Sequence, residues 1–85
     1  MKKEYKLNFP DPFLQKHYEQ YHMELAKFVN SDMPLAVYQG AVVKATKACK
    51  WVDVDKVGEM PVHEVLELST QIAEIIQEKI SPPKN

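Results

Sequence analysis

The sequence predicts a mainly α-helical fold: a small bundle of three main helices with a short connecting turn, edged by a short N-terminal strand or an extended arm. Three stretches place apolar residues three and four positions apart, which is the spacing of one helix face. The segments between these stretches are short, as in compact bundles. Because 85 residues are too few for two cores, we expect one helical domain over residues 11–81, an N-terminal arm over residues 1–10 and a flexible tail over residues 82–85.

The first residues alternate in polarity. Tyr5, Leu7 and Phe9 fall on one side of an extended chain, and polar residues separate them until Pro10 interrupts the pattern. This alternation is typical of a short strand or an extended arm. A strand here would need a partner elsewhere in the chain.

The first helix is expected to begin at Asp11 and Pro12 and to end near Asn30. An aspartate can cap free backbone amides, and proline fits the first helical position because its missing N–H would have no partner there. Asn30 is expected to end the helix in the left-handed conformation. The apolar face of this helix consists of Leu14, Tyr18, Tyr21, Leu25 and Phe28.

The second helix is expected to begin within residues 31–34 and to run to about Cys49. Gly40 is its weak point, costing up to about 1 kcal/mol relative to alanine, unless it permits close packing. The residues after this helix, 51–58, are interpreted as a link whose short turn is opened by Asp53 and closed by Gly58. The apolar face of the helix consists of Leu35, Tyr38, Ala41, Val42, Ala45 and Cys49.

The third helix is expected from Pro61 to about Ile80 and has the strongest pattern. Leu68 and Ile75 lie off its apolar stripe, and we expect both to stay uncovered in a small bundle, as apolar residues at a partner site often are. The stripe itself consists of Val62, Val65, Leu66, Ile72, Ala73, Ile76 and Ile80. Acidic residues surround the stripe and are interpreted as a solvated face: Glu64, Glu67, Glu74 and Glu78.

The histidines and the cysteine form no recognisable catalytic or metal-binding pattern. His17 and His22 lie five positions apart, about 140° around a helix, so they do not share a face as a helical zinc pair does. Cys49 is the sole cysteine and cannot form an internal disulfide, and the two glycines are too far apart for a phosphate-binding loop. We therefore expect no enzymatic activity, no metal and no cofactor.

Charge gives two interpretations of one lysine-rich stretch. The formal net charge is −1 and arginine is absent, so nothing draws the whole chain to nucleic acid. Lys44, Lys47 and Lys50 recur every third residue beside Trp51, which together could form a nucleic-acid patch with a stacking surface. Alternatively, the lysines complement the dipole of a helix C-terminus and Trp51 packs in the core. We favour the second interpretation.

The N-terminal stretch has charged residues but no apolar segment of signal-peptide length, and no run of the chain approaches a membrane span. The lone cysteine fits a reducing compartment. We therefore expect a cytoplasmic protein that does not bind membranes.

Residues 45–76 resemble a known family. The stretches Ala45–Trp51, Val52–Met60 and Pro61–Leu68 form a helix end, a linker with acidic and valine residues, a short turn ending in methionine, and an amphipathic last helix. This order is similar to the C-terminal half of the small tail assembly chaperones of tailed phages and prophages. The resemblance implies a helical, non-enzymatic protein that coats apolar helical segments of the tape measure protein before the tail tube forms, in the host cytoplasm if the chain is phage-encoded.

The resemblance, together with the expected exposure of the last helix, leads to a set of predicted contacts and to alternatives. The predicted partner-binding residues are Leu68, Ile72, Ile75 and Ile76. A thin core would also favour a homo-oligomer. The competing hypotheses are a small helical nucleic-acid-binding or regulatory domain that uses Lys44, Lys47, Lys50 and Trp51, and a structural subunit of an oligomer.

Overall fold

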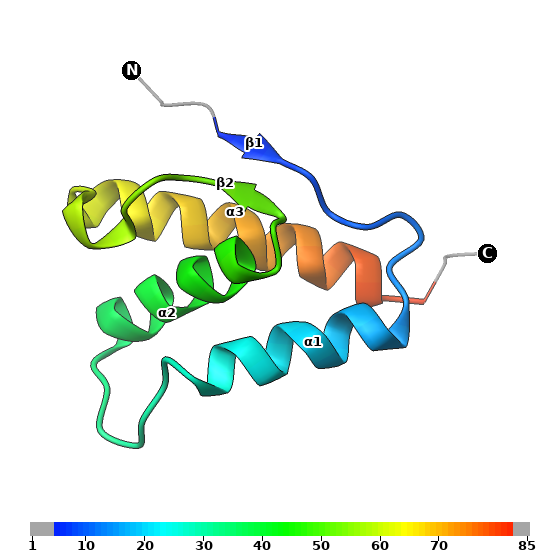
Figure 1. The fold of residues 1–85 in the computed structure, drawn as a ribbon, viewed down its shortest axis with the longest axis horizontal. Coiled ribbons are helices and arrows are strands. Elements are labelled where there is room, and N and C mark those ends of the chain that lie inside the picture. Colours follow the sequence, from blue (N-terminus) through cyan, green and yellow to red (C-terminus); the bar gives the residue numbers. More distant parts are fainter. Residues whose placement is uncertain (1–4, 83–85) are drawn as a thin grey trace.

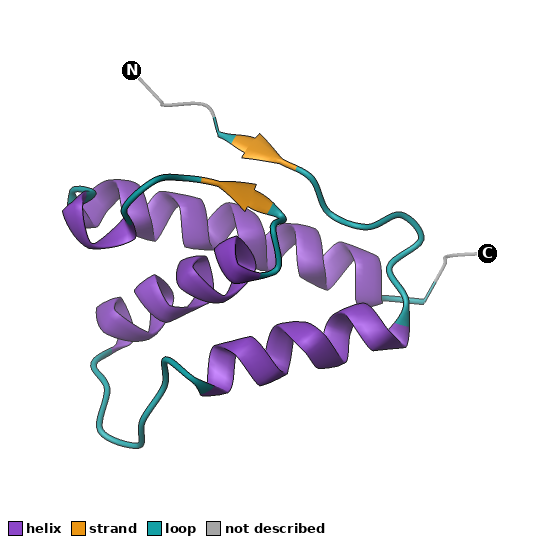
Figure 2. Cartoon of the chain, viewed as in Figure 1, coloured by secondary structure: helices purple, strands orange, loops and turns teal. Residues whose placement is uncertain are grey.

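The computed structural model describes residues 5–82 and contains three α-helices and a small antiparallel sheet (Figures 1 and 2). This confirms the mainly α-helical fold and its three main helices. The first four residues of the expected arm, and residues 83–85 of the expected tail, lie outside the described residues. The elements in chain order are β1 (Lys6–Leu7), α1 (Gln15–Ala26), α2 (Leu35–Ala48), β2 (Val52–Asp53), the short 3-10 helix η1 (Val57–Glu59) and α3 (Val62–Ile80).

Helix α2 lies at the centre of the bundle. It packs against both α1 and α3, and it also contacts β2 and η1 (Figure 1). The start of α1 approaches the end of α3, where Phe13 and Leu14 share a hollow with Lys79 and Ile80. The strands lie along one edge of the helices (Figure 2). The core is therefore arranged around α2.

The N-terminal segment forms a strand, and its partner is the link after α2. Leu7 pairs with Val52 in an antiparallel ladder, and the Asn8 N–H donates to the Trp51 carbonyl over 2.7 Å. Val52 is buried, and Leu7 packs against the core. The link was interpreted only as a turn; it also supplies the second strand of the sheet.

Helix α1 is shorter than the sequence indicated at both ends. It begins at Gln15 rather than at Asp11, and the Leu14 N–H donates to His17 Nδ1 over 3.0 Å. Before it, Phe9 and Phe13 each pack against the ring of Trp51 with centroids 5.3 Å apart. These aromatic contacts hold the preceding segment against the core, outside the helix.

The end of α1 also differs from the expectation. The helix stops at Ala26. Asn30 does not take the left-handed conformation: among the described residues, Lys50 alone has a positive φ. Instead, the Asn30 side-chain oxygen accepts a hydrogen bond from the Asp32 N–H over 3.2 Å. Asn30 therefore stabilises the turn toward α2 rather than the end of α1.

The end of α2 is a Schellman motif in which the left-handed residue is a lysine. The Trp51 N–H donates to the Thr46 carbonyl over 3.0 Å, and the Lys50 N–H donates to the Lys47 carbonyl over 2.9 Å. Lys50 has φ of 66°, a conformation that side chains with a Cβ disfavour. The motif turns the chain so that Trp51 enters the core.

We expect Lys50→Gly to raise the free energy of unfolding by about 0.5–1 kcal/mol, because glycine takes the left-handed conformation without a steric cost. Urea denaturation followed by circular dichroism measures this change. Lys44→Gly is the matched control: it also removes an exposed lysine of the same segment, but from the helix interior, and is expected to lose about 1 kcal/mol. A loss of stability in Lys50→Gly would contradict the backbone conformation described.

Gly40 lies inside α2 and faces α3, and the packing at this position leaves room for a small side chain. A Cβ built at this position would meet Val65 Cγ1 at 3.9 Å, an ordinary van der Waals distance. We therefore expect Gly40→Ala to raise the free energy of unfolding by about 0.5–1 kcal/mol, through higher helix propensity and a less flexible unfolded chain. Thermal denaturation checks it, and a lower melting temperature would mean that α2 and α3 need closer packing here.

Candidate protein-binding groove

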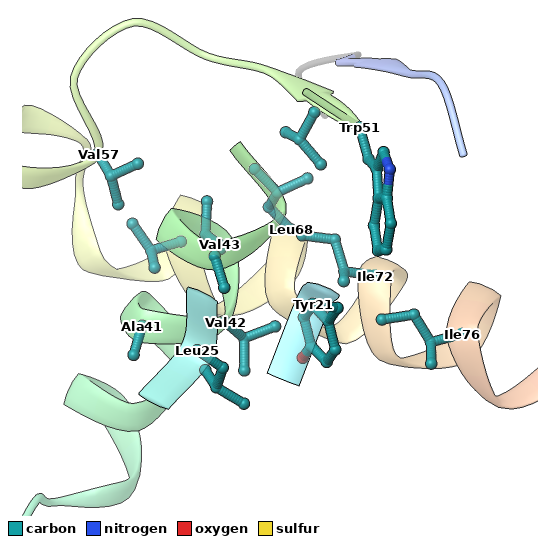
Figure 3. Close-up of a cluster of buried hydrophobic side chains, with 13 residues drawn as sticks. Tyr21, Leu25, Ala41, Val42, Val43, Trp51, Val57, Leu68, Ile72 and Ile76 are labelled. Carbon is teal, nitrogen blue, oxygen red and sulfur yellow. The ribbon is translucent and has the colours of Figure 1, made fainter. Parts of the chain in front are cut away.

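Three of the four predicted partner-binding residues are core residues. Leu68 and Ile72 are 0% exposed and Ile76 is 7% exposed, while Ile75 is half-buried. Figure 3 shows Leu68, Ile72 and Ile76 within the cluster of buried side chains. The expectation that Leu68 stays uncovered is therefore wrong. In the folded chain, a partner could reach only Ile75 of this set without displacing the core.

The buried face of α3 is rotated relative to the stripe read from the sequence. Val65, Leu68, Ile72 and Ile76 follow spacings of 3, 4 and 4 and turn toward α2, whereas Val62 at the start of the helix is 65% exposed. Periodicity gives the helix but leaves the direction of its face uncertain when apolar residues occupy more than one side.

The predicted nucleic-acid patch is brought together only in part. Lys44, Lys47 and Lys50 are exposed, and the Lys47 ammonium donates to the Asp55 carbonyl. Lys6, which sequence reasoning did not include, joins Lys47 and Lys50 around a hollow of about 540 Å³.

Trp51 is not available as a stacking surface. It is 5% exposed, and its ring packs against Phe9, Phe13 and Tyr21, with the Tyr21 centroid 6.0 Å away in a stacked arrangement. Figure 3 shows the Trp51 side chain pointing into the core toward Tyr21. The interpretation of Trp51 as a core residue is confirmed, and its proposed role in base stacking is wrong.

An open groove lies between α2 and α3, and Tyr21 of α1 contributes to its floor. Its volume is about 740 Å³. Tyr21, Val42 and Ser69 form its buried floor, whereas Leu35 at the mouth is 73% exposed. The lining consists of Tyr21, Leu35, Tyr38, Gln39, Val42, Ser69, Thr70, Ala73, Glu74, Gln77 and Glu78.

The groove follows from the residues that face each other across it. On α2, Leu35, Tyr38 and Val42 follow helical spacing and form one apolar face. On α3, Ser69 and Ala73 are four residues apart and therefore adjacent along one line of the helix. Because these two side chains are small, they leave the apolar face of α2 partly uncovered. This spacing of small residues was the sequence signal that could have indicated the groove.

The hydroxyl groups of Ser69 and Thr70 in the groove already have partners within α3. Ser69 Oγ donates to the Leu66 carbonyl over 3.1 Å, and Thr70 Oγ1 donates to the same carbonyl over 2.9 Å. Hydroxyls bonded back to their own helix offer few directional contacts to a ligand. The floor therefore suits apolar side chains better than a polar small molecule.

The electrostatics of the groove differ between its floor and its edge. Burial, and then the neighbouring hydroxyls of Tyr38 and Tyr18, raise the pKa of Tyr21 to about 12, so its phenol stays uncharged at neutral pH. At the edge, Glu74 and Glu78 are both exposed. Within the described residues, no cationic side chain lines the groove. It has a neutral floor and an acidic edge.

Cys49 has a free thiol and is half-buried. Burial, and then Glu24, raise the pKa of the Cys49 thiol, which favours the unreactive protonated form. Over residues 5–82, no cluster of three or more histidine, cysteine or acidic side chains could hold a metal ion. Within the same range, no helix is both long enough and apolar enough to cross a membrane.

Comparison of the chain with protein-family models, with curated proteins and with solved structures finds no match.

Proposed function

We propose that this chain is a non-enzymatic phage or prophage tail assembly chaperone that binds apolar helical segments of a tape measure protein in the host cytoplasm. The observation that carries the proposal is the groove between α2 and α3, whose mouth exposes Leu35 and Tyr38 over a neutral floor. We therefore propose the groove, and not Leu68, Ile72 and Ile76, as the binding surface.

A helix that enters the groove would bury apolar side chains that are exposed in the isolated chain. Leu35 is largely exposed and Tyr38 partly so, and burial stabilises a large apolar side chain by about 1.5–3 kcal/mol when it is complete. An amphipathic helix laid into an apolar groove is a common mode of peptide recognition. Such a partner would cover both residues and keep its own apolar face from aggregating.

The resemblance supports one wall of the groove more than the other. Residues 45–76 include most of α3, with Ser69, Thr70, Ala73 and Glu74 of the lining. The α2 wall, from Leu35 to Val42, precedes the stretch that resembles the family. The exposed apolar residues of the α2 wall therefore support a binding groove independently of the family resemblance.

Co-expression with a tape measure protein tests the proposal. We expect the chain to raise the soluble fraction of the tape measure protein severalfold, and Leu35→Glu to abolish the effect. Val62→Glu is the matched control, because Val62 is also the first residue of a helix after a proline and is similarly exposed, but it lies outside the groove. A tape measure protein that is equally soluble alone, or equal effects of both substitutions, would contradict the proposal.

The second candidate is a small nucleic-acid-binding or regulatory domain. It is favoured by the hollow that Lys6, Lys47 and Lys50 share, which places three cations around one depression. Electrophoretic mobility at low ionic strength, with single-stranded and duplex oligonucleotides, tests it. The chaperone proposal expects no retention of either nucleic acid under these conditions.

The third candidate is a structural subunit whose helices complete a homo-oligomer. Exposed Leu35 and Val62 would be covered in such an assembly. Light scattering across a range of concentrations measures the oligomer, and the Leu35→Glu variant shows whether the groove forms its interface.

A further inference from the structure

The acidic edge of the groove restricts which charged residues can flank the apolar face of a bound helix. Glu74 and Glu78 are four residues apart on α3, so they are neighbours on one side of the helix. The ion pairs within the described residues are Lys27–Glu24 and Lys56–Glu59, and neither includes Glu74 or Glu78. Both carboxylates are exposed at the edge of an apolar surface, and within residues 5–82 neither is paired with a cation.

These two glutamates are placed unfavourably for the isolated chain. Like charges four residues apart on a helix repel each other, and Glu78 lies in the last turn of α3, where the helix dipole favours cations. Lys79 follows Glu78 in the sequence but lines a different hollow with Phe13 and Leu14. Cations from a partner would offset both the repulsion between the two glutamates and the unfavourable interaction of Glu78 with the helix dipole.

The α2 residues that line the groove carry no charge. Leu35, Tyr38 and Gln39 line the groove from α2 and are all neutral. A helix that lies in the groove therefore meets an apolar wall on one side and two carboxylates on the other. The complementary ligand has an apolar face bordered by cations along one edge only, spaced like Glu74 and Glu78.

We propose that the occupant of the groove is an amphipathic protein helix whose apolar face is flanked, on the α3 side, by lysine or arginine residues about four positions apart. This inference rests on the proposed function, and it deepens it by stating which apolar helices the groove selects. Helices flanked by acids would be rejected, because their carboxylates would face Glu74 and Glu78.

Two synthetic peptides of about 18 residues, a length that forms roughly five helical turns, test the inference on the full chain. Both carry the same leucine face, and one is flanked by lysines and the other by glutamates. Fluorescence anisotropy of the labelled peptides measures their Kd. We expect the lysine peptide to bind about tenfold more tightly than the glutamate peptide, with a preference that weakens as salt rises.

Charge variants locate the preference. Glu74→Lys is expected to remove or reverse it, whereas Glu67→Lys makes the same charge change on an exposed residue of α3 outside the groove and should preserve it. Leu35→Glu should weaken the binding of the lysine peptide. Equal effects of Glu74→Lys and Glu67→Lys would show a general charge effect and overturn the inference.

The remaining outcomes separate this inference from the proposed function. If both peptides bind equally and Leu35→Glu weakens both, the cation preference is overturned while the groove remains a binding site. If neither peptide binds but the tape measure protein is still solubilised in a Leu35-dependent manner, the inference fails and the proposed function stands. If sedimentation shows a dimer that Leu35→Glu dissociates, the occupant is a second copy of this chain and the inference is overturned.

Discussion

Replacing Trp51 by alanine is expected to lower the free energy of unfolding by about 3–5 kcal/mol, the usual cost of removing a buried aromatic side chain. Trp51 is almost fully buried and contacts three aromatic residues from two segments: Phe9 and Phe13 before α1, and Tyr21 within it. Removing the indole would leave a cavity among rings that cannot all collapse into it. An 85-residue domain is stabilised by roughly 4–13 kcal/mol, so a large part of the native state would be lost.

Urea denaturation followed by far-ultraviolet circular dichroism measures this effect, since the variant has no tryptophan fluorescence. Trp51→Phe is the control, because a smaller ring retains part of the aromatic packing and should cost clearly less. A loss below about 1 kcal/mol in Trp51→Ala would mean that the ring is not buried, and it would reopen the stacking role in a nucleic-acid patch.

Replacing Leu68 by alanine is expected to lower the free energy of unfolding by about 2–5 kcal/mol. Leu68 is fully buried on α3 and belongs to the same core cluster as Val43 and Ile72. Ile75 lies about two turns further along the helix and is only half-buried, so Ile75→Ala should lower the free energy of unfolding distinctly less. Tryptophan fluorescence during urea denaturation checks both variants, because Trp51 reports the state of the core.

The Leu68 variant also decides between two accounts of α3. If Leu68 were a partner contact, alanine at this position would weaken binding and leave stability nearly unchanged. If the free energy of unfolding of Leu68→Ala is within about 0.5 kcal/mol of the wild-type value, the core role is contradicted and the interpretation made from the sequence is favoured.

The helices were predictable because their signals are local. Pro34 and Pro61 each stand one residue before a helix, and the apolar spacing after them extends to within about two residues of where α2 and α3 end. The start of α1 was not predictable in this way. Phe9 and Phe13 keep that segment on Trp51, a residue far away in the sequence.

The sheet, the direction of α3 and the groove depend on tertiary structure. A two-residue strand such as Val52–Asp53 has too little pattern to distinguish it from a turn until Leu7 pairs with it. Leu68 looked peripheral because the face of α3 is set by where α2 lies, which periodicity does not give. The groove needs both walls in place, although Ser69 and Ala73 were a usable signal on one of them.

The most direct test of the groove as the binding site is a nuclear magnetic resonance titration of the ¹⁵N-labelled chain with an apolar helical segment of a tape measure protein. We predict that the amide shifts concentrate around Tyr21, residues 35–42 and residues 69–78, which line the groove. Shifts centred instead on Lys6, Lys47 and Lys50, or no shifts at saturating peptide, would contradict the account.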